Sequence, residues 1–238
     1  MTIRILAAKA TEPDSDGDSR FEVSFSFTNE SCSTVELLQV RLLVCAPDGT
    51  PLGEAEEEIE EMISQGESGR MSVSSYRIPY PLQTVTDAKL TLTVVPLSCI
   101  FIDAGRLSVP SQPGGISCST EPISSAGLCL QRWSCHRRRD DRDGEVSIEA
   151  CAWLENNTTK TIHKPVIRLQ LFNYSGRPLN DAESRDDRLL FSDIPAVLTE
   201  SLYCKNSQLR DSYICATVRG FLLMNPESVN IAELQLDR

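Results

Sequence analysis

Apolar and polar side chains alternate with a period of two residues along much of this chain. The alternation is clearest at residues 21–27, where the sequence FEVSFSF puts every large apolar side chain on one face. Residues 148–154 keep the same phase with smaller side chains, and the alternation resumes at 40–44 and 167–171. Such a period is typical of half-buried β-strands. The pattern therefore predicts an all-β protein.

An internal repeat sets the expected architecture. A shift of 127 residues aligns residues 16–52 with 143–179 without a gap, and ten of the 37 positions are identical. The identical pairs are Asp16/Asp143, Gly17/Gly144, Glu22/Glu149, Asn29/Asn156, Thr34/Thr161, Arg41/Arg168, Leu42/Leu169, Gly49/Gly176, Pro51/Pro178 and Leu52/Leu179. Several short strands between turn residues are typical of a sandwich. We expect two tandem immunoglobulin-like β-sandwich domains with separate sheets, in which Phe25 and Ala152 are equivalent and buried.

A segment poor in large apolar residues lies between the two copies. Residues 109–125 are rich in Pro, Gly and Ser, a composition typical of a linker between domains. We therefore expect a first sandwich domain at residues 1–108, a linker at 109–125 and a second sandwich domain at 126–238.

The order of turns in the first copy resembles that of a known family. An alternating strand ends at Asn29, a later strand ends in an Asp-Gly turn at 48–49, and a Gly-Glu turn at 66–67 precedes another apolar strand. This order resembles the small immunoglobulin-like modules of the bacterial FxLYD type. The second copy keeps Asn156 and Gly176 but lacks the Gly-Glu turn. The resemblance implies an immunoglobulin-like fold with a recognition role and no shared catalytic residues.

The formal net charge of −11 narrows the class of partner. A nucleic-acid partner is disfavoured because phosphate binding needs a cationic surface, and anionic membrane surfaces are disfavoured for the same reason. Residues 1–10 are interrupted by Arg4 and Lys9, so they do not form the apolar core of a secretory signal. No apolar run approaches the length of a membrane span. We expect a cytoplasmic protein without membrane insertion, whose partner is another protein.

The chain has nine cysteines, an odd number without regular spacing. In a chain without an export signal we expect reduced thiols, and we expect folding to need no disulfide. Three of the cysteines and a histidine fall within one short stretch, namely Cys118, Cys129, Cys135 and His136. Their spacing lacks the paired C-x2-C knuckles of a zinc site, so we expect no metal there, with zinc as the alternative.

The first Asp-Gly turn resembles the start of a calcium-binding loop. Three aspartates surround Gly17 in the sequence DSDGD, namely Asp14, Asp16 and Asp18. The glutamate required at the twelfth position of such a loop is Phe25 in this chain. We therefore expect a solvated hairpin tip rather than a calcium site.

Residues for catalysis are scarce. The sequence has two histidines, His136 and His163, and it contains no Gly-x-Ser-x-Gly elbow, phosphate loop or dinucleotide fingerprint. We therefore expect a protein that is not an enzyme and that needs no cofactor.

Two charged clusters are candidate sites for binding a partner. The cationic cluster comprises His136, Arg137, Arg138, Arg139 and Arg142. We expect it to form either an exposed specificity turn, because arginine recognises carboxylates, or a solvated loop. The acidic cluster comprises Glu56, Glu57, Glu58, Glu60 and Glu61. We expect it to form an edge strand or a mobile loop, which either discourages aggregation or docks a basic partner.

Two functions fit these expectations. The first is a non-enzymatic protein-binding module, such as an adaptor, chaperone or assembly component, which uses loops or edge strands of its two sandwiches. The alternative is a cytosolic immunity protein that neutralises a toxin through an acidic surface. For the first function we expect the arginines at 137–139 to determine specificity, and their replacement to leave folding almost intact.

Overall fold

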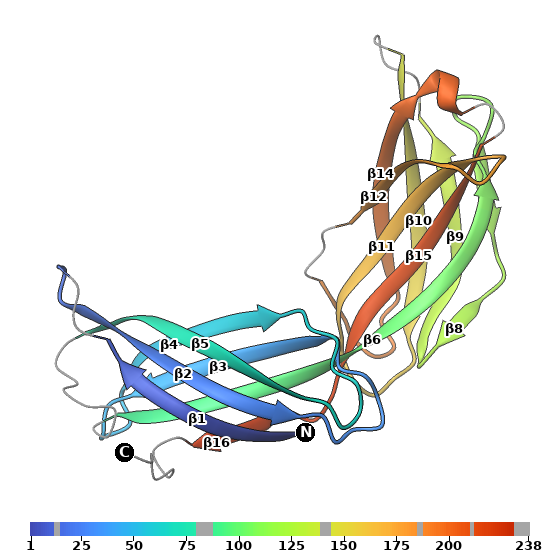
Figure 1. Ribbon diagram of the computed structural model, residues 1–238. Helices are drawn as coiled ribbons and strands as arrows, with labels where there is room; N and C mark the ends of the chain where they lie inside the picture. The colour runs from blue at the N-terminus through green and yellow to red at the C-terminus, as the bar shows by residue number, and fades with distance from the viewer. Residues whose placement is uncertain (12–14, 80–87, 139–143, 185–187, 210–211, 231–238) are drawn as a thin grey trace. The chain divides into compact units, whose positions relative to one another are not determined.

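The protein is described here by a computed structural model (Figure 1). It describes residues 1–238 except 12–14, 80–87, 139–143, 185–187, 210–211 and 231–238. The strands are β1 (Thr2–Ala10), β2 (Asp18–Thr28), β3 (Leu37–Cys45), β4 (Pro51–Ile59), β5 (Ser68–Pro79), β6 (Lys89–Ser108), β7 (Ile116–Ser119), β8 (Ile123–Ser125), β9 (Leu128–Arg137), β10 (Glu145–Asn156), β11 (Ile162–Asn173), β12 (Pro178–Glu183), β13 (Leu189–Leu190), β14 (Ala196–Lys205), β15 (Ser212–Leu223) and β16 (Glu227–Asn230). The all-β prediction is confirmed. No helix in this described part is long and apolar enough to cross a membrane.

The chain forms two compact units. The first unit consists of Met1–Cys99 and Leu223–Arg238, and the second unit consists of Ile100–Leu222. The chain leaves the first unit within β6 and returns to it at the end of β15. β16 therefore completes the first unit, although it follows the second unit in sequence.

The prediction of a linker between domains at residues 109–125 has to be corrected. That segment lies inside the second unit, where it forms β7 and β8. Both strands pair antiparallel with β9, with Ile116 opposite His136 and Ile123 opposite Leu130. Pro, Gly and Ser mark turns, and here these turns connect strands of one sheet.

The first unit is a β-sandwich. One sheet has the order β1-β2-β5, and facing it are strands in the order β4-β3-β6, with β16 also paired to β6. The alternating apolar side chains of β2, from Phe21 to Phe27, are buried in one core with those of β3 and β6. Phe25 is fully buried, which confirms the prediction for this residue.

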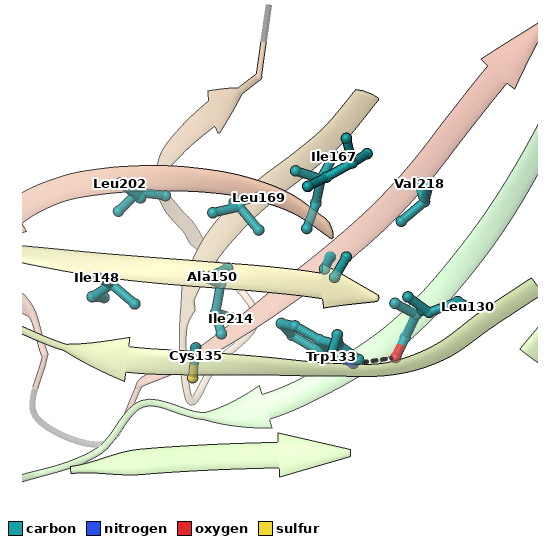
Figure 2. Close-up of a cluster of buried hydrophobic side chains, with 14 of the residues drawn as sticks. Leu130, Trp133, Cys135, Ile148, Ala150, Ile167, Leu169, Leu202, Ile214 and Val218 are labelled. Atoms are coloured by element: carbon teal, nitrogen blue, oxygen red, sulfur yellow. Dashed lines mark hydrogen bonds between the residues drawn. The ribbon is translucent and has the colours of Figure 1, made fainter. Parts of the chain in front are cut away.

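The second unit repeats this arrangement. One sheet has the order β14-β10-β9-β7, with β8 also on β9, and the facing strands have the order β12-β11-β15-β6, with β13 on β11. Their inner faces share the core drawn in Figure 2. Trp133 is fully buried there, and its Nε1 donates a hydrogen bond of 2.8 Å to Ala104 O. Ala152 is also fully buried, as predicted.

β6 contributes to a sheet in each unit. Its first half pairs with β3, from Lys89 opposite Cys45 to Leu97 opposite Leu37, and β6 also neighbours β15. Among the described strands the hydrogen-bonded order therefore runs β12-β11-β15-β6-β3-β4. The expectation of separate sheets is corrected accordingly, because one strand of 20 residues serves both.

Candidate functional site

A buried asparagine fixes the segment between β13 and β14. Asn156, at the end of β10, has no exposed surface. Its Nδ2 donates to Lys160 O (2.7 Å) and to Leu190 O (2.9 Å). Its Oδ1 accepts from the backbone N (2.9 Å) and the Oγ1 (2.6 Å) of Thr158. Asp193 N donates to the backbone O of Asn156 (3.2 Å), so one residue ties the end of β10 to this segment.

The first unit contains the same arrangement. Asn29 is equally buried, and its Nδ2 donates to Ser33 O and Ile63 O, each at 2.9 Å. Its Oδ1 accepts from the backbone N (3.1 Å) and the Oγ (2.6 Å) of Ser31, and Gly66 N donates to Asn29 O (2.7 Å). Every member precedes its counterpart in the second unit by 127 positions. We call each of these clusters an asparagine hub.

The segment that the second hub holds exposes large apolar side chains. The exposed fractions are 43% for Leu189, 51% for Phe191, 57% for Ile194 and 38% for Val197. Between them, Asp193 adopts a left-handed conformation with φ 60°, and Ile194 N donates to Phe191 O (3.5 Å). We call these four exposed side chains the apolar corner.

The first unit builds the same turn with different side chains. The counterparts of the apolar corner at the 127-residue shift are Met62, Ser64, Glu67 and Arg70. All four are exposed, and Glu67 Oε2 accepts from Ser64 N (2.7 Å). A mostly polar set therefore suffices for the turn, and the fold does not require apolar residues here. The second unit thus exposes apolar side chains at positions where the repeat also accommodates polar ones.

An aromatic side chain lies beside the apolar corner in the outer phase of the adjoining sheet. Trp153 on β10 is opposite Val197 on β14 and opposite Arg132 on β9. The guanidinium carbon of Arg132 lies 4.0 Å from the centre of the Trp153 ring. The counterpart of Trp153 in the first unit is Ser26. Tryptophan and arginine are the residues most enriched in the energetic centres of interfaces.

The cationic cluster expected to determine specificity is not one exposed patch. Arg137 follows Trp133 and Cys135 in the inward phase of β9 and is only 5% exposed. Its Nη1 donates to Ser111 O (2.7 Å) and its Nη2 to Asn206 Oδ1 (3.0 Å). The interpretation of Arg137 as an exposed contact residue is therefore corrected. Its burial predicts instead that replacing it lowers stability.

The remaining members of that cluster occupy different environments. Arg138 is exposed, and its Nη2 lies 2.6 Å from Glu149 Oε2, a hydrogen bond that is the main cause of the raised pKa of Arg138. His136 is half-buried and lies opposite Glu149 in the register of β9 and β10. Arg139 and Arg142 lie outside the described residues. Their role in binding stays a prediction.

The acidic cluster forms an edge strand, one of the two expected outcomes. Its candidate residues on β4 or directly after it are Glu56, Glu57, Glu58, Glu60 and Glu61. Arg41 on β3 lies 2.6 Å from Glu54 and 3.4 Å from Glu56. The second unit repeats this cross-strand pair with Arg168 and Asp181 at 3.1 Å. Two glutamates of β4, Glu54 and Glu56, thus form ion pairs with an arginine of the neighbouring strand.

The residues considered for metal binding are dispersed. Cys129 and Cys135 are buried on β9, whereas Cys118 on β7 is exposed. Burial raises the pKa of Cys135 to about 11, which opposes formation of the thiolate that zinc requires. Among the described residues, no group of three or more His, Cys, Asp or Glu is placed to hold a metal. For the calcium alternative, Gly17 forms a turn with φ 81°, and Asp14 lies outside the described residues.

Buried thiols predict a loss of stability at alkaline pH. All nine cysteines are free, and burial raises the pKa of Cys135 and of Cys204 to about 11. Above the ordinary thiol pKa near 9 the unfolded chain loses protons that the folded chain keeps. The free energy of unfolding should therefore fall as the pH rises from about 9 towards about 11, as measured by urea titrations. A Cys135→Ala/Cys204→Ala double variant should show a flatter dependence, and an unchanged slope would assign the effect to other groups.

No protein-family model matches this chain, and no curated protein matches it. A structure named pT26-6p is 7% identical, with 92% of this chain and 65% of that chain covered and a TM-score of 0.25. Red sea bream transglutaminase is 11% identical, with 91% and 31% covered and a TM-score of 0.25. This chain spans less than two thirds of either of those chains. An infectious bursal disease virus Gt strain structure is 7% identical, with 98% and 73% covered and a TM-score of 0.27. TM-scores this low carry no argument about fold or function.

Proposed function

We propose that this protein is a non-enzymatic protein-binding module whose second unit carries the contact surface, formed by the apolar corner and Trp153. The observation that supports it most is the internal comparison. At the same turn of the repeat, the second unit exposes Phe191, Ile194 and Val197 where the first unit has a serine, a glutamate and an arginine. Both turns are held by an asparagine hub, so the exchange concerns the surface and not the backbone.

The energetics of this surface suit protein recognition. A fully buried large apolar side chain contributes about 1.5–3 kcal/mol, so two or three of them would be a substantial part of the binding free energy. The hub fixes the backbone that carries Phe191, because Leu190 O and Asp193 N both bond to Asn156. A preformed turn loses little conformational entropy on binding, which favours affinity.

The fold class that accompanies this proposal is a pair of immunoglobulin-like sandwiches related by duplication. It is supported by the equivalent strand orders of the two units and by the paired hubs at Asn29 and Asn156. The resemblance to FxLYD-type modules stays a prediction. So does the immunity-protein alternative, for which Glu56 is the one candidate residue that contacts Arg41 among the described ion pairs.

A variant that gives the second unit the side chains of the first should lose the partner. The changes are Phe191→Ser, Ile194→Glu and Val197→Arg, each to the residue at the counterpart position. The tagged full-length chain is used to capture proteins from its native cells, and the proteins captured are quantified by mass spectrometry. A partner retained by the wild type should be lost by this corner variant, and its affinity measured by calorimetry should fall at least about tenfold.

A matched variant in the first unit provides the control. Ser64→Ala, Glu67→Ala and Arg70→Ala alter the same three positions of the repeat and should leave the captured proteins unchanged. Circular dichroism and urea unfolding should show both variants within about 0.5 kcal/mol per substitution of the wild type, since all sites are exposed. Full retention of every partner by the folded corner variant would contradict the proposed function.

A further inference from the structure

The two units differ in how one edge of the equivalent sheet is covered. In the second unit, β9 is flanked by β10 on one side and by β7 and β8 on the other. Its counterpart in the first unit, β1, is the terminal strand of the sheet β1-β2-β5. Among the described residues, added strands therefore cover this edge in the second unit but not in the first.

The backbone of the two strands has the same hydrogen-bonding phase. Arg138 N donates to Ser147 O (2.9 Å), and at the counterpart positions Thr11 N donates to Arg20 O (2.8 Å). Antiparallel ladders alternate, so the residue before each of these donors turns its N–H and C=O to the opposite side. In the second unit that residue is Arg137, whose backbone N–H and C=O both form hydrogen bonds with the segment that precedes β7.

The backbone hydrogen bonds of Arg137 show how this edge can hold a further strand. Arg137 N donates to Gly115 O (3.1 Å), and Gly114 N donates to Arg137 O (2.8 Å). The counterpart of Arg137 in the first unit is Ala10. By the same alternation, Ala10 and Ala8 direct their backbone groups away from β2. The edge of β1 thus presents the pattern that an added antiparallel strand requires.

A bulge interrupts this edge in both units. Edge strands often carry bulges that discourage pairing with other chains. In β1 the register with β2 skips Leu6, and in β9 the register with β10 skips Gln131. In the second unit the bulge does not exclude a neighbour, because β7 pairs on one side of it and β8 on the other.

The two bulges are not at equivalent positions. Leu6 lies between the residues opposite Phe25 and Ser24, and the counterparts of those two lie opposite Trp133 and Ser134, where β7 pairs without interruption. We therefore expect an added strand on β1 to pair with Ala8 and Ala10, on one side of Leu6.

The charged residues beside this edge indicate which kind of strand would pair with it. Arg132 in β9 and Arg4 in β1 are counterparts, since they lie opposite Trp153 and Ser26 respectively. The segment that covers β9, residues 116–125, contains one glutamate and no lysine or arginine. That residue, Glu121, lies in the connection that passes the bulge, between pairings to Trp133 and Leu130. Arg4 lies at the level of β1 that corresponds to this connection, so an acidic residue there would complement its charge.

We propose that the edge of β1 binds an extended strand of another protein, rich in small and apolar residues and acidic at the level of Arg4. Main-chain hydrogen bonds to Ala8 and Ala10 would provide the affinity, and Arg4 would favour the acidic residue. This site lies in the first unit and shares no residue with the apolar corner. It is therefore tested by different variants, and its failure leaves the proposed function intact.

The test uses the full-length protein and a synthetic peptide with the sequence of residues 114–126, acetylated at its N-terminus and carrying Cys118→Ser. Calorimetry should show saturable binding to the wild type. Ala8→Pro removes an N–H that faces the edge without removing a bond to β2, and proline is tolerated in edge strands. It should weaken peptide binding at least tenfold, whereas Ala8→Ser, which keeps the N–H, should bind like the wild type. The unfolding midpoint of Ala8→Pro should stay within a few degrees of the wild type.

Further arms separate the possible outcomes. A peptide with Glu121→Lys should bind more weakly, and a peptide N-methylated at the amide of Gly114 should lose affinity as well. Absence of saturable binding, or equal binding by folded Ala8→Pro, overturns the proposal. Sedimentation of the protein alone tests a second copy as the occupant. A dimer that Ala8→Pro abolishes would assign the edge to self-association and overturn the proposed partner.

Discussion

Replacing Asn156 with alanine should lower the free energy of unfolding of the second unit by about 3 kcal/mol. The side chain is fully buried and makes hydrogen bonds to Lys160 O, Leu190 O and Thr158. Alanine removes these bonds and leaves Leu190 O without the amide that it bonds in the interior. An unsatisfied buried polar group costs about 1–3 kcal/mol by itself, which adds to the lost bonds.

The neighbouring residue offers a matched control for this prediction. Asn157 is exposed, and its backbone N donates to Gly127 O, a bond that alanine keeps. Asn157→Ala should therefore change stability by less than about 0.5 kcal/mol. Urea unfolding monitored by tryptophan fluorescence measures both variants, since Trp133 and Trp153 lie in the second unit. Equal effects of the two substitutions would contradict the structural role of the hub.

The hub illustrates what the sequence could and could not predict. Asn29 and Asn156 were recognisable as identical ends of equivalent strands. Their hydrogen-bond partners were not, because Ser33 and Lys160, or Ile63 and Leu190, contribute main-chain carbonyls that any residue type supplies. The network depends on where these carbonyl groups lie and not on the side chains of the residues that carry them. It can therefore be recognised only from the backbone geometry.

The division of the chain shows the limit of composition as a boundary signal. Residues 109–125 have the composition of a linker, yet β7 and β8 there complete the edge of β9. The chain instead passes between the units inside β6, whose alternating apolar side chains continue on both sides of Cys99. Turn-forming residues report local backbone conformation, whereas a shared strand depends on pairing with distant segments. The all-β class followed from local alternation and was therefore predictable.

The candidate site was predictable in part. The repeat predicted equivalent turns. The comparison that identifies the apolar corner also requires that the 127-residue shift continue as far as Ile63 and Leu190. Their bonds to the two hubs establish that extension. Arg137 was predicted to be exposed from the charge of its neighbours. The alternation of Trp133, Cys135 and Arg137 on β9 contained the opposite signal, because residues two apart share a face.

Replacing Arg137 with alanine should destabilise the second unit by about 3 kcal/mol or more. Its guanidinium is buried and bonds Ser111 O at 2.7 Å and Asn206 Oδ1 at 3.0 Å. These bonds tie the segment before β7 to the short helix between β14 and β15, Asn206–Gln208. Alanine leaves both acceptors without this donor and leaves a space in the structure that the long side chain had filled.

Two further substitutions make this prediction specific. Arg138→Ala removes an exposed ion pair with Glu149, for which a cost of less than about 1 kcal/mol is expected. Arg137→Lys keeps the charge but loses the planar fork that reaches Ser111 and Asn206 together, so it should restore only part of the stability. Urea titrations at pH 7 compare the three variants with the wild type. If Arg137→Ala cost no more stability than Arg138→Ala, the buried structural role of Arg137 would be contradicted. The cationic cluster would then again be a candidate site for binding a partner.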